Sequence, residues 1–498
     1  MNEDRGKFKF DDRFRKIIEE QMIADPDEAG APPGGKKSET TVDNIRFDIT
    51  PEELIAYLKE YIVEQEQTID ILATKICTHF HRMNLERENP DLPKIIGDVK
   101  PNVLLIGPTG VGKTYLVKLI ADKLHVPFVK GDATKFSETG YVGGDVEDLI
   151  RELVHQAGDD INLAEYGIVY IDEIDKIASS GNLTGPDVSR GGVQRNLLKL
   201  MEETEVDMKV PHDLASQMEA VMETQRTGKA SRKKVNTRNI LFVMSGAFTG
   251  LSEIIARRLK KGGMGFTGEK IASNTDIPLL LSRLHVKDLV EYGFEAEFVG
   301  RTPVIAFLEE LTEEGLYKIL DNPKSSVIRA KKRDFKAYGI KLIFDDDVLR
   351  FFASEANDHG TGARGLVSVV EKYLLPFEKK LPSTSVKQFH VTLDHIHRST
   401  EILPEMITEH AFATYIDSFK AQTGINLEFS PSARIVAVEK AEKQGKLLRD
   451  YLEETLKDYL YGLKLVGLEE FSVTRKVLDS PKAYLDKLVK NSYKKKSE

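Results

Sequence analysis

The segment GPTGVGKT, from Gly107 to Thr114, most constrains how this chain of 498 residues can fold. It matches the phosphate-loop pattern G-x-x-x-x-G-K-[ST] and stands between an apolar run, VLLI, and a helical pattern, as the motif requires. Main-chain N–H groups of such a loop turn toward phosphates, while the lysine supplies charge and the threonine offers a hydroxyl to Mg²⁺. The predicted nucleotide-binding residues are Gly107, Pro108, Thr109, Gly110, Val111, Gly112, Lys113 and Thr114.

A second apolar run, GIVYID, ends in Asp172 and is followed by Glu173. Asp172 can hold Mg²⁺ through water, and Glu173 can orient and deprotonate an attacking water. Apolar strands also end in acidic residues where they simply meet solvent, but this pair comes 59 residues after the phosphate-loop lysine. The order favours ATP hydrolysis over nucleotide binding alone, with ATP and Mg²⁺ as cofactors.

Short apolar runs alternate with helical patterns in the first half of the chain, and they span residues 103–107, 126–131, 167–172 and 239–246. This alternation is typical of a parallel sheet with helices on both faces. After about Arg301 the pattern becomes mainly helical, with one strand-like segment at 339–344. We therefore predict an α/β core of the phosphate-loop NTPase class, followed by a smaller α-rich C-terminal domain.

The N-terminal region differs in composition from the rest. Residues 11–23 place Phe14 and Ile17 on one face of a short amphipathic helix, and residues 24–45 have the Pro, Gly, Ser and charge content of a flexible linker. Thr50, in TPEEL, predicts the N-cap of a helical stretch that runs toward Arg87. The predicted parts are an N-terminal helix at 1–23, a linker at 24–48, an ATPase domain at 49–312, a small domain at 313–400 and a C-terminal extension at 401–498.

An internal repeat appears when the sequence is shifted by 85 residues, because residues 339–366 then align with 424–451 without a gap. This match indicates either a duplicated small domain or two strand-to-helix units that share a common pattern. The second segment lacks the Gly-Ala pair before its arginine, Arg449. A duplicate would therefore be degenerate and would have lost the role of the first copy.

Composition excludes several classes of protein. The formal net charge of −9 gives no electrostatic footprint for coating nucleic acid or a membrane, so neither is expected as a partner. The single cysteine, Cys77, rules out an intramolecular disulfide and is expected to be buried. His79 and His81 lie two residues apart on a predicted helix and face different ways, unlike a zinc pair. Without an apolar signal core or a membrane-spanning run, we expect a cytoplasmic protein.

The order of motifs resembles the AAA+ protein unfoldases of the ClpX and HslU group over about residues 50–385. The resemblance rests on GPTGVGKT, GYVGGDVEDLIRELV, IDEIDKI, GGVQRNLLKLME, NILFVMSGAF, FVGRTPV and TGARGL. It is closer to ClpX, because the acidic strand follows GYVG within about 30 residues and leaves no room for the inserted domain of HslU. Unlike ClpX, the chain has no four-cysteine zinc domain at its N-terminus.

This resemblance implies further nucleotide contacts. Ile62 and Val63 would flank the adenine, although Glu64 replaces the usual glycine beside them. Ser245 would be the first sensor of the γ phosphate, and Arg364 the second. Arg301 would be the arginine finger that reaches the nucleotide of a neighbouring subunit, as in the hexameric rings of the family.

The resemblance also implies contacts with polypeptide. A paddle in the central pore would consist of Gly140, Tyr141, Val142 and Gly143, and a tight turn is the alternative. A loop that docks on a ClpP-type peptidase would contain Met264, Gly265 and Phe266, although the family has Ile in place of the Met. A basic pore-entrance loop, or else a solvated charge run, would contain Arg232, Lys233 and Lys234.

The resulting hypothesis is a ring-forming, ATP-dependent unfoldase that threads protein substrates through a central pore for a ClpP-type peptidase. Two alternatives remain open at this stage. One is a remodelling chaperone that works without a peptidase. The other is a nucleotide-gated scaffold or nucleic-acid remodeller that does not thread peptide at all.

Overall fold

The computed structural model describes residues 42, 45–93, 99–137, 144–178, 188–208, 233–262, 277–384 and 386–496. The chain divides into two compact units. The first comprises Met1–Ser325 and Ala356–Leu366, and the second comprises Ser326–Glu355 and Val367–Glu498. The predicted N-terminal helix and most of the predicted linker lie outside the described residues.

A five-stranded sheet forms the centre of the first unit, in the order β2-β3-β6-β1-β7. Its strands are β1 (Val103–Ile106), β2 (Phe128–Asp132), β3 (Ile168–Asp172), β6 (Leu241–Gly246) and β7 (Val304–Phe307). Every neighbouring pair is parallel, so the carboxyl ends of all five strands lie along one edge. The inner strands β1 and β6 are buried throughout, which explains their continuous apolar sequences. The predicted parallel α/β core is confirmed.

The edge strand β7 corrects the expectation that the chain becomes mainly helical after Arg301. It pairs with β1 from Val103↔Val304 to Ile106↔Phe307. Its burial alternates along four residues, because Val304 and Ala306 are buried in the core, while Ile305 and Phe307 pack against it but stay partly exposed. So short a run, preceded by a proline, gives little periodic signal in the sequence.

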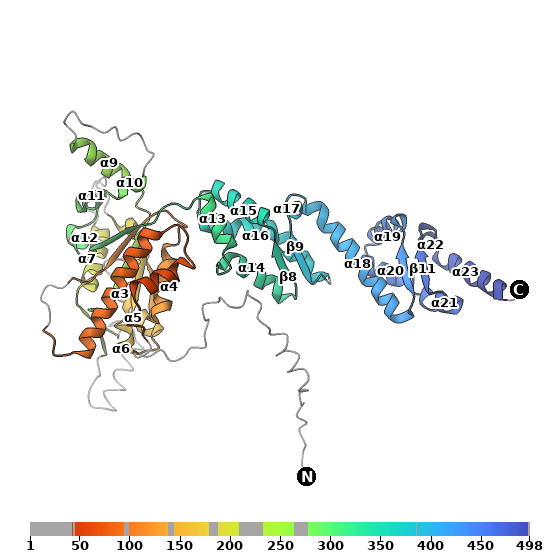
Figure 1. Cartoon of the computed structure of the whole chain (residues 1–498), viewed down its shortest axis with the longest axis horizontal. Coiled ribbons are helices and arrows are strands. Elements are labelled where there is room, and N and C mark those ends of the chain that lie inside the picture. The colour runs from red at the N-terminus through yellow and green to blue at the C-terminus, as the bar shows by residue number, and fades with distance from the viewer. Residues whose placement is uncertain are drawn as a thin grey trace, which may run out of the picture. The chain divides into compact units, whose positions relative to one another are not determined.

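Helices surround this sheet, and α3 lies in front of the strands in Figure 1. They are α2 (Pro51–Lys59), α3 (Glu66–Glu88), α4 (Lys113–Leu124), α5 (Asp148–Gln156), α6 (Ile161–Ala164), α7 (Val188–Met201), α9 (Leu251–Gly262), α10 (Ile277–Leu281), α11 (Val286–Tyr292), α12 (Ala296–Gly300) and α13 (Glu313–Asp321). A small antiparallel hairpin, β4 (Glu205–Asp207) with β5 (Lys234–Asn236), completes the unit. Cys77 is buried in the core on α3, as predicted.

The stretch from Thr50 toward Arg87 is two helices rather than one. Thr50 caps α2 as predicted, since its Oγ1 accepts from the main-chain N–H of Glu53 while the Glu53 carboxylate accepts from the N–H of Thr50. The chain then leaves the helix at residue 60 and re-enters it at Glu66. Glu64 has a left-handed backbone, with φ of 59°, and a helix cannot pass through that conformation.

The second unit begins with a module built on the parallel pair β8 (Lys341–Phe344) and β9 (Gln388–Val391). Its helices are α14 (Ser326–Ala337), α15 (Asp346–Asp358), α16 (Ala363–Lys380) and α17 (Leu393–His397), and α15 and α16 contribute residues to both units. Lys331 of α14 is buried there, and its Nζ lies 2.7 Å from a carboxylate oxygen of both Glu371 and Glu378 on α16. The predicted α-rich domain is confirmed.

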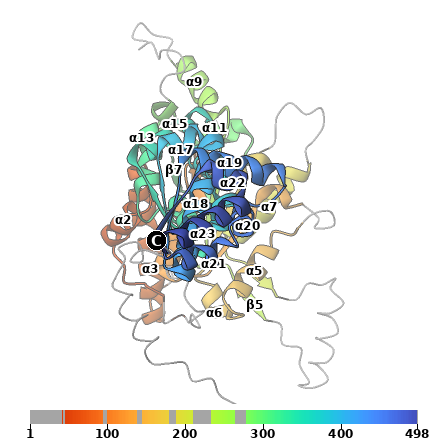
Figure 2. The same ribbon diagram turned by 90° about the vertical axis from the view of Figure 1, so that its right-hand side faces the viewer.

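A second module with a similar order of elements follows, with one more helix before its second strand and one more at its end. It consists of α18 (Ser399–Thr423), β10 (Asn426–Phe429), α19 (Pro431–Lys443), α20 (Leu448–Thr455), α21 (Tyr459–Val466), β11 (Glu470–Val473), α22 (Arg475–Asp479) and α23 (Pro481–Lys496). Strands β10 and β11 pair in parallel, as β8 and β9 do. Figure 1 shows this module in blue between α18 and the C-terminus, and Figure 2 views it with the C-terminus toward the reader.

The two modules agree in backbone conformation at aligned glycines and also in the elements that follow the aligned residues. Gly339 and Gly424 precede β8 and β10 with φ of 75° and 77°, and Gly360 and Gly445 follow the next helices with φ of 60° and 62°. The later pairs, β9 with β11 and α17 with α22, extend the same order. This shared order favours a duplication over two unrelated units.

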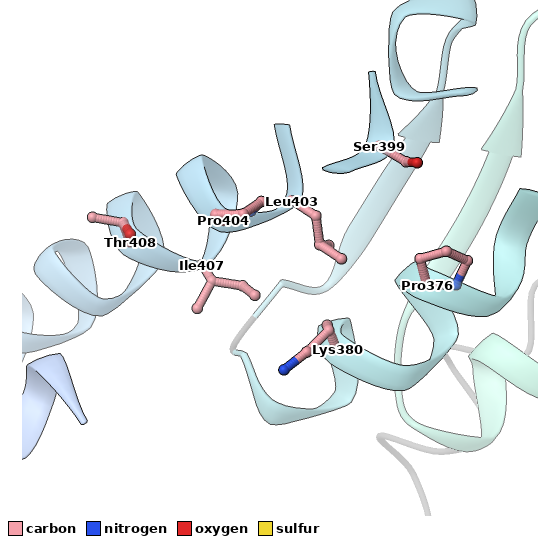
Figure 3. Close-up of a pocket in the computed structure, with 7 residues that line it drawn as sticks. All are labelled: Pro376, Lys380, Ser399, Leu403, Pro404, Ile407 and Thr408. Carbon is pink, nitrogen blue, oxygen red and sulfur yellow. The ribbon is translucent and has the colours of Figure 1, made fainter. Parts of the chain in front are cut away.

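A pocket of about 390 Å³ lies between α16 and the first turns of α18. Figure 3 shows Leu403 and Ile407 of α18 extending toward this space, with Pro376 and Lys380 of α16 on its other side. The pocket belongs to the second unit and includes no residue of the phosphate loop. Among the described helices, none has the length and apolar character needed to cross a membrane.

Candidate functional site

The phosphate loop begins where β1 ends, at the carboxyl edge of the sheet, and leads directly into α4. Gly110 and Gly112 have φ of 81° and 94°, a left-handed conformation that glycine adopts without strain. Gly112 is the N-cap of α4, so the free N–H groups of the first helical turn face the loop. A Cβ at Gly112 would meet nothing within 4 Å. The loop therefore has the open space and the N–H donors that phosphates require.

Lys113 lies inside this loop, with 8% of its surface exposed. Its Nζ donates to the carbonyl oxygens of Gly107 and Pro108, each at 2.6 Å. Burial lowers the pKa of the Lys113 ammonium, and the positive charge of Arg364 acts in the same direction, against the opposing carboxylates of Asp172 and Asp175. The ammonium is thus held by neutral carbonyls that phosphate oxygens can replace.

A chain of side-chain hydrogen bonds connects three of the predicted residues. The Thr114 Oγ1 donates to the Tyr170 hydroxyl at 3.0 Å, and that hydroxyl lies 2.6 Å from the Ser245 Oγ. Ser245 in turn donates to the Asp172 Oδ1 at 2.8 Å. The structure therefore brings Thr114, Ser245 and Asp172 together, as the sequence predicts, through a residue that was not predicted.

That residue is Tyr170, which is completely buried in β3. Burial raises the pKa of its phenol to about 12, so the hydroxyl stays protonated at neutral pH. A signal for it exists in the sequence, because Tyr170 stands two residues before Asp172 in a strand and thus on the same face. A tyrosine among aliphatic strand residues needs a polar partner when buried, and the acidic end of this strand supplies one.

Asp172 has a second unpredicted partner, Lys130 of β2. The Lys130 Nζ lies 3.0 Å from the Asp172 Oδ2, and the main-chain N–H of Glu173 donates to Oδ1 at 3.1 Å. Burial works to raise the pKa of Asp172, but the bonds from Lys130, Ser245 and Glu173 outweigh it, and the pKa lies below its ordinary value. Asp172 is therefore an anion that can hold a cation.

Glu173 follows the strand with a left-handed backbone, φ of 57°, and its side chain is exposed. Non-glycine residues adopt this conformation at a cost of about 1–3 kcal/mol, and such residues are enriched at functional sites. Here the turn carries the carboxylate beyond the strand end, at the same edge as the phosphate loop. Its role as a base stays a prediction.

Arg364 reaches the phosphate loop through the turn that precedes α16. The main-chain N–H of Ala363 donates to the Gly110 carbonyl at 2.9 Å. The approach is close, because a Cβ at Gly110 would lie 2.1 Å from the Thr361 carbonyl oxygen. Arg364 lies in the first turn of α16, so the structure brings it to the site as the sequence predicts.

Hydrogen bonds to residues at both ends of α13 hold the turn that contains Ile62 and Val63. The Glu64 carboxylate accepts from the main-chain N–H of Thr312 at 3.0 Å and from its Oγ1 at 2.6 Å. At the other end of α13, the Asn322 Nδ2 donates to the Glu60 carbonyl at 2.8 Å. These bonds explain how a glutamate can stand where a glycine is usual, since they offset the left-handed strain of about 1–2 kcal/mol.

Arg301 does not join this cluster. It precedes β7, whose first residue pairs with Val103 at the start of β1, so it lies at the amino edge of the sheet. Its guanidinium pairs with the Glu202 carboxylate at 2.7 Å, and its carbonyl accepts from the buried Asn102 Nδ2 at 3.0 Å. Within one subunit Arg301 thus stands at the opposite sheet edge from Lys113.

Several predicted residues lie outside the described part of the chain. They are Gly140, Tyr141, Val142, Gly143, Arg232, Met264, Gly265 and Phe266. Lys233 and Lys234 are described and exposed, and the Lys234 Nζ lies 2.7 Å from the Glu205 carboxylate across the β4–β5 hairpin. The roles of all these residues stay predictions.

The predicted helical histidines each bond a main-chain carbonyl. The Nε2 of buried His79 lies 3.0 Å from the Asn239 oxygen, and that of His81 lies 3.0 Å from the Ile49 oxygen. Within the described ranges, no group of three or more His, Cys, Asp or Glu side chains is arranged to hold a metal ion. The phosphate-loop site instead has the oxygen atoms of the predicted metal residues Thr114 and Asp172, the ligand type that Mg²⁺ prefers when phosphates and water complete its shell.

Comparisons with known proteins agree with this geometry. The family described as "AAA domain (Cdc48 subfamily)" matches residues 98–305, and the "C-terminal, D2-small domain, of ClpB protein" matches residues 311–381. The "ATP-dependent Clp protease ATP-binding subunit ClpX" of Treponema denticola is 41% identical over 337 residues, which cover 67% of this chain and 78% of the relative. The chain belongs to the ClpX family.

Other relatives of the same name extend the match. The ClpX of Borrelia duttonii is 37% identical over 72% of this chain and 81% of its own length. The ClpX of Bacteroides thetaiotaomicron is 36% identical over 74% of this chain and 86% of its own length. The predicted family and fold are therefore confirmed, and this ClpX-family chain is an AAA+ ATPase that binds nucleotide.

Proposed function

We propose that this ClpX-family chain forms a hexameric ring that hydrolyses ATP with Mg²⁺ and threads protein substrates through a central pore for a ClpP-type peptidase. Its relatives are named as ATP-binding subunits of an ATP-dependent Clp protease. We assign the ATPase domain to residues 49–312, the small domain to 313–400 and the extension to 401–498. Residues 1–23 and 24–48 would be a helix and a linker that precede the ring.

The opposed positions of Lys113 and Arg301 carry the ring proposal. The phosphate loop lies at the carboxyl edge of the sheet, and Arg301 lies at the amino edge. Strands β1 and β7 separate these edges, and each has four residues, a length of about 13 Å. A finger arginine so placed cannot serve its own nucleotide and must serve that of a neighbour. Such a head-to-tail contact closes into a ring when the rotation between neighbouring subunits returns to the first subunit, as we propose here.

Within one site, the residues divide the chemistry of hydrolysis. Lys113 and the N–H groups of α4 would bind the β and γ phosphates, while Thr114 and Asp172 would hold Mg²⁺. Glu173 would orient and deprotonate the attacking water, and Ser245, with Arg364, would contact the γ phosphate. Mg²⁺ would supply charge neutralisation at the transferring phosphoryl group.

We assign contact with the protein substrate to Tyr141 in the pore. We assign docking on the peptidase to the loop Met264–Phe266. The test is ATP-dependent unfolding of a tagged fluorescent protein, with and without a ClpP-type peptidase. Loss of fluorescence followed by degradation is expected when the peptidase is present. Unfolding without degradation, even with the peptidase present, would support a remodelling chaperone that works without a peptidase. Absence of unfolding would refute threading.

A Tyr141→Ala variant tests the pore assignment separately. It should keep ATPase activity and assembly, since the paddle lies away from the phosphates, and lose unfolding, because a methyl group offers little surface to grip. Unfolding at the wild-type rate per ATP would contradict threading and would favour a scaffold or nucleic-acid remodeller. Joint loss of ATPase activity and assembly would show that Tyr141 is a structural residue.

A further inference from the structure

We propose that Tyr170 is a positioning residue for the metal ligand Thr114. Its hydroxyl accepts the hydrogen bond of the Thr114 hydroxyl, so that the lone pairs of the Thr114 oxygen remain available to the cation that accompanies the nucleotide. The inference rests on the proposed function, because it takes Thr114 and Asp172 as the Mg²⁺ site. It adds a residue that carries no role in the hydrolysis scheme above.

The direction of the hydrogen-bond chain follows from counting protons. The Asp172 carboxylate only accepts, so the single proton of Ser245 is committed to the Oδ1 at 2.8 Å. Ser245 must then accept from Tyr170, at 2.6 Å, which commits the single phenol proton. Tyr170 can therefore only accept from Thr114, at 3.0 Å. Every hydroxyl in the chain points its proton toward Asp172.

This direction matters for the threonine oxygen. A hydroxyl binds a hard cation through its lone pairs, and its proton must point away from the metal to another acceptor. Tyr170 is that acceptor, and it is completely buried, so water cannot easily replace it. The relay also joins Thr114 to the charge on Asp172, the other protein group assigned to the metal. The Thr114 hydroxyl is thereby oriented by one chain of bonds that ends at Asp172.

The ring of Tyr170 has a separate, structural role. It lies 6.3 Å from the ring of Phe128, and the Lys130 ammonium lies 5.9 Å from its centroid. Phenylalanine would fill the same space, and a buried hydroxyl without hydrogen-bond partners would destabilise the folded state. Its partners are Thr114 and Ser245, both assigned to the site. The hydroxyl can therefore be removed while the packing is kept.

The test is Tyr170→Phe, with equilibrium binding of a fluorescent ADP analogue in Mg²⁺ and in EDTA. The affinity in EDTA should change less than twofold, while the enhancement by Mg²⁺ should fall about fivefold to tenfold, as expected for the loss of one hydrogen bond. Tyr166→Phe is the matched control, because it removes a hydroxyl from a ring packed on Phe47 in the same unit. It should keep the wild-type enhancement.

A Thr114→Ala background makes the test sharper. If the hydroxyl acts through Thr114, adding Tyr170→Phe to that background should change nothing further. If Tyr170→Phe fails to fold, Ser245→Ala breaks the same chain one bond later and should also reduce the Mg²⁺ enhancement selectively.

Two results would overturn the inference. An unchanged Mg²⁺ enhancement in Tyr170→Phe would mean that the relay does not act on the metal. An equal loss of affinity in Mg²⁺ and in EDTA would mean that the hydroxyl is merely structural. A wild-type protein that bound ADP equally well in both solutions would refute the magnesium assignment itself, and the inference with it.

Discussion

Two glycines in the turn before α16 provide a matched pair for testing how Arg364 reaches the phosphate loop. Gly360 and Gly362 have φ of 60° and 59°, so alanine at either position meets the same left-handed strain. A Cβ at Gly360 would meet nothing within 4 Å, whereas one at Gly362 would lie 2.9 Å from the Gly110 carbonyl oxygen. The pair therefore separates conformational strain from contact with the loop.

The expected magnitudes follow from these contacts. Left-handed strain destabilises each alanine variant by roughly 1–2 kcal/mol. Gly362→Ala must in addition push main-chain atoms apart, which costs about 1–3 kcal/mol when the neighbours can yield only by backbone shifts. The shift would break the bond from the Ala363 N–H to the Gly110 carbonyl and move Arg364 with its turn. Gly362→Ala should thus lose nucleotide affinity, and Gly360→Ala should not.

The assay is thermal unfolding of the full chain, with and without ADP, together with equilibrium binding of a fluorescent ADP analogue. Gly362→Ala should lower the melting temperature more than Gly360→Ala and should show the smaller stabilisation by ADP. Equal melting temperatures and equal ADP affinities for the two variants would refute the reasoning. They would mean that the turn does not stand against the phosphate loop.

Three further variants test the site and the fold. Glu173→Gln should bind ATP but release no phosphate at steady state, since an amide cannot take the proton of water; turnover near wild type would exclude Glu173 as the base. Arg301→Ala should stop hydrolysis in the assembly but regain part of it in rings mixed with Glu173→Gln subunits, and an Arg301→Ala protein as active as wild type would contradict action in trans. Lys331→Met should reduce amide-exchange protection of α14 and α16 by about 3 kcal/mol, the lower end for removing one partner of a buried ion pair, because Glu371 is half exposed. Burial acts to lower the pKa of Lys331, but Glu371 and Glu378 outweigh it and raise that pKa. The stabilisation by the ion cluster is therefore complete below the unfolded-state pKa of about 10.4 and is lost as the pH rises through the folded-state pKa. Amide-exchange protection that does not change with pH up to 12 would argue against the ion cluster.

The sequence predicts which residues lie at the carboxyl edge of the sheet because the information for that placement is local. An apolar strand followed by a glycine-rich loop, or by an acidic pair, specifies both an element and the end of that element at which chemistry occurs. Asp172 and Lys113 could be placed at one edge for this reason alone. Parallel strands then bring their carboxyl ends together without any further information.

The features that escaped prediction depend on partners distant in the chain. Glu64 adopts a left-handed backbone that its own propensity disfavours, and the bonds that hold it there come from Thr312, 248 residues later. The local sequence shows Lys130 only as a charged residue in an apolar strand. The pairing of β2 with β3 brings it to Asp172. Strand β7 is specified by its pairing with β1 more than by its own four residues. In each case the local pattern is weak and tertiary contact decides the conformation.

Helix α18 belongs to both modules of the second unit. Its first turns carry Leu403 and Ile407 toward α16, while Phe412, Tyr415 and Phe419 further along are buried in the core of the last module. In stacked modules, stability is the sum of each module's own stability and the contacts between neighbours. The chain after residue 400 is therefore joined to the preceding module through the first turns of α18, while its buried core is its own. A cut at that point would remove Leu403 and Ile407 from beside α16 and leave that side of α16 open to water.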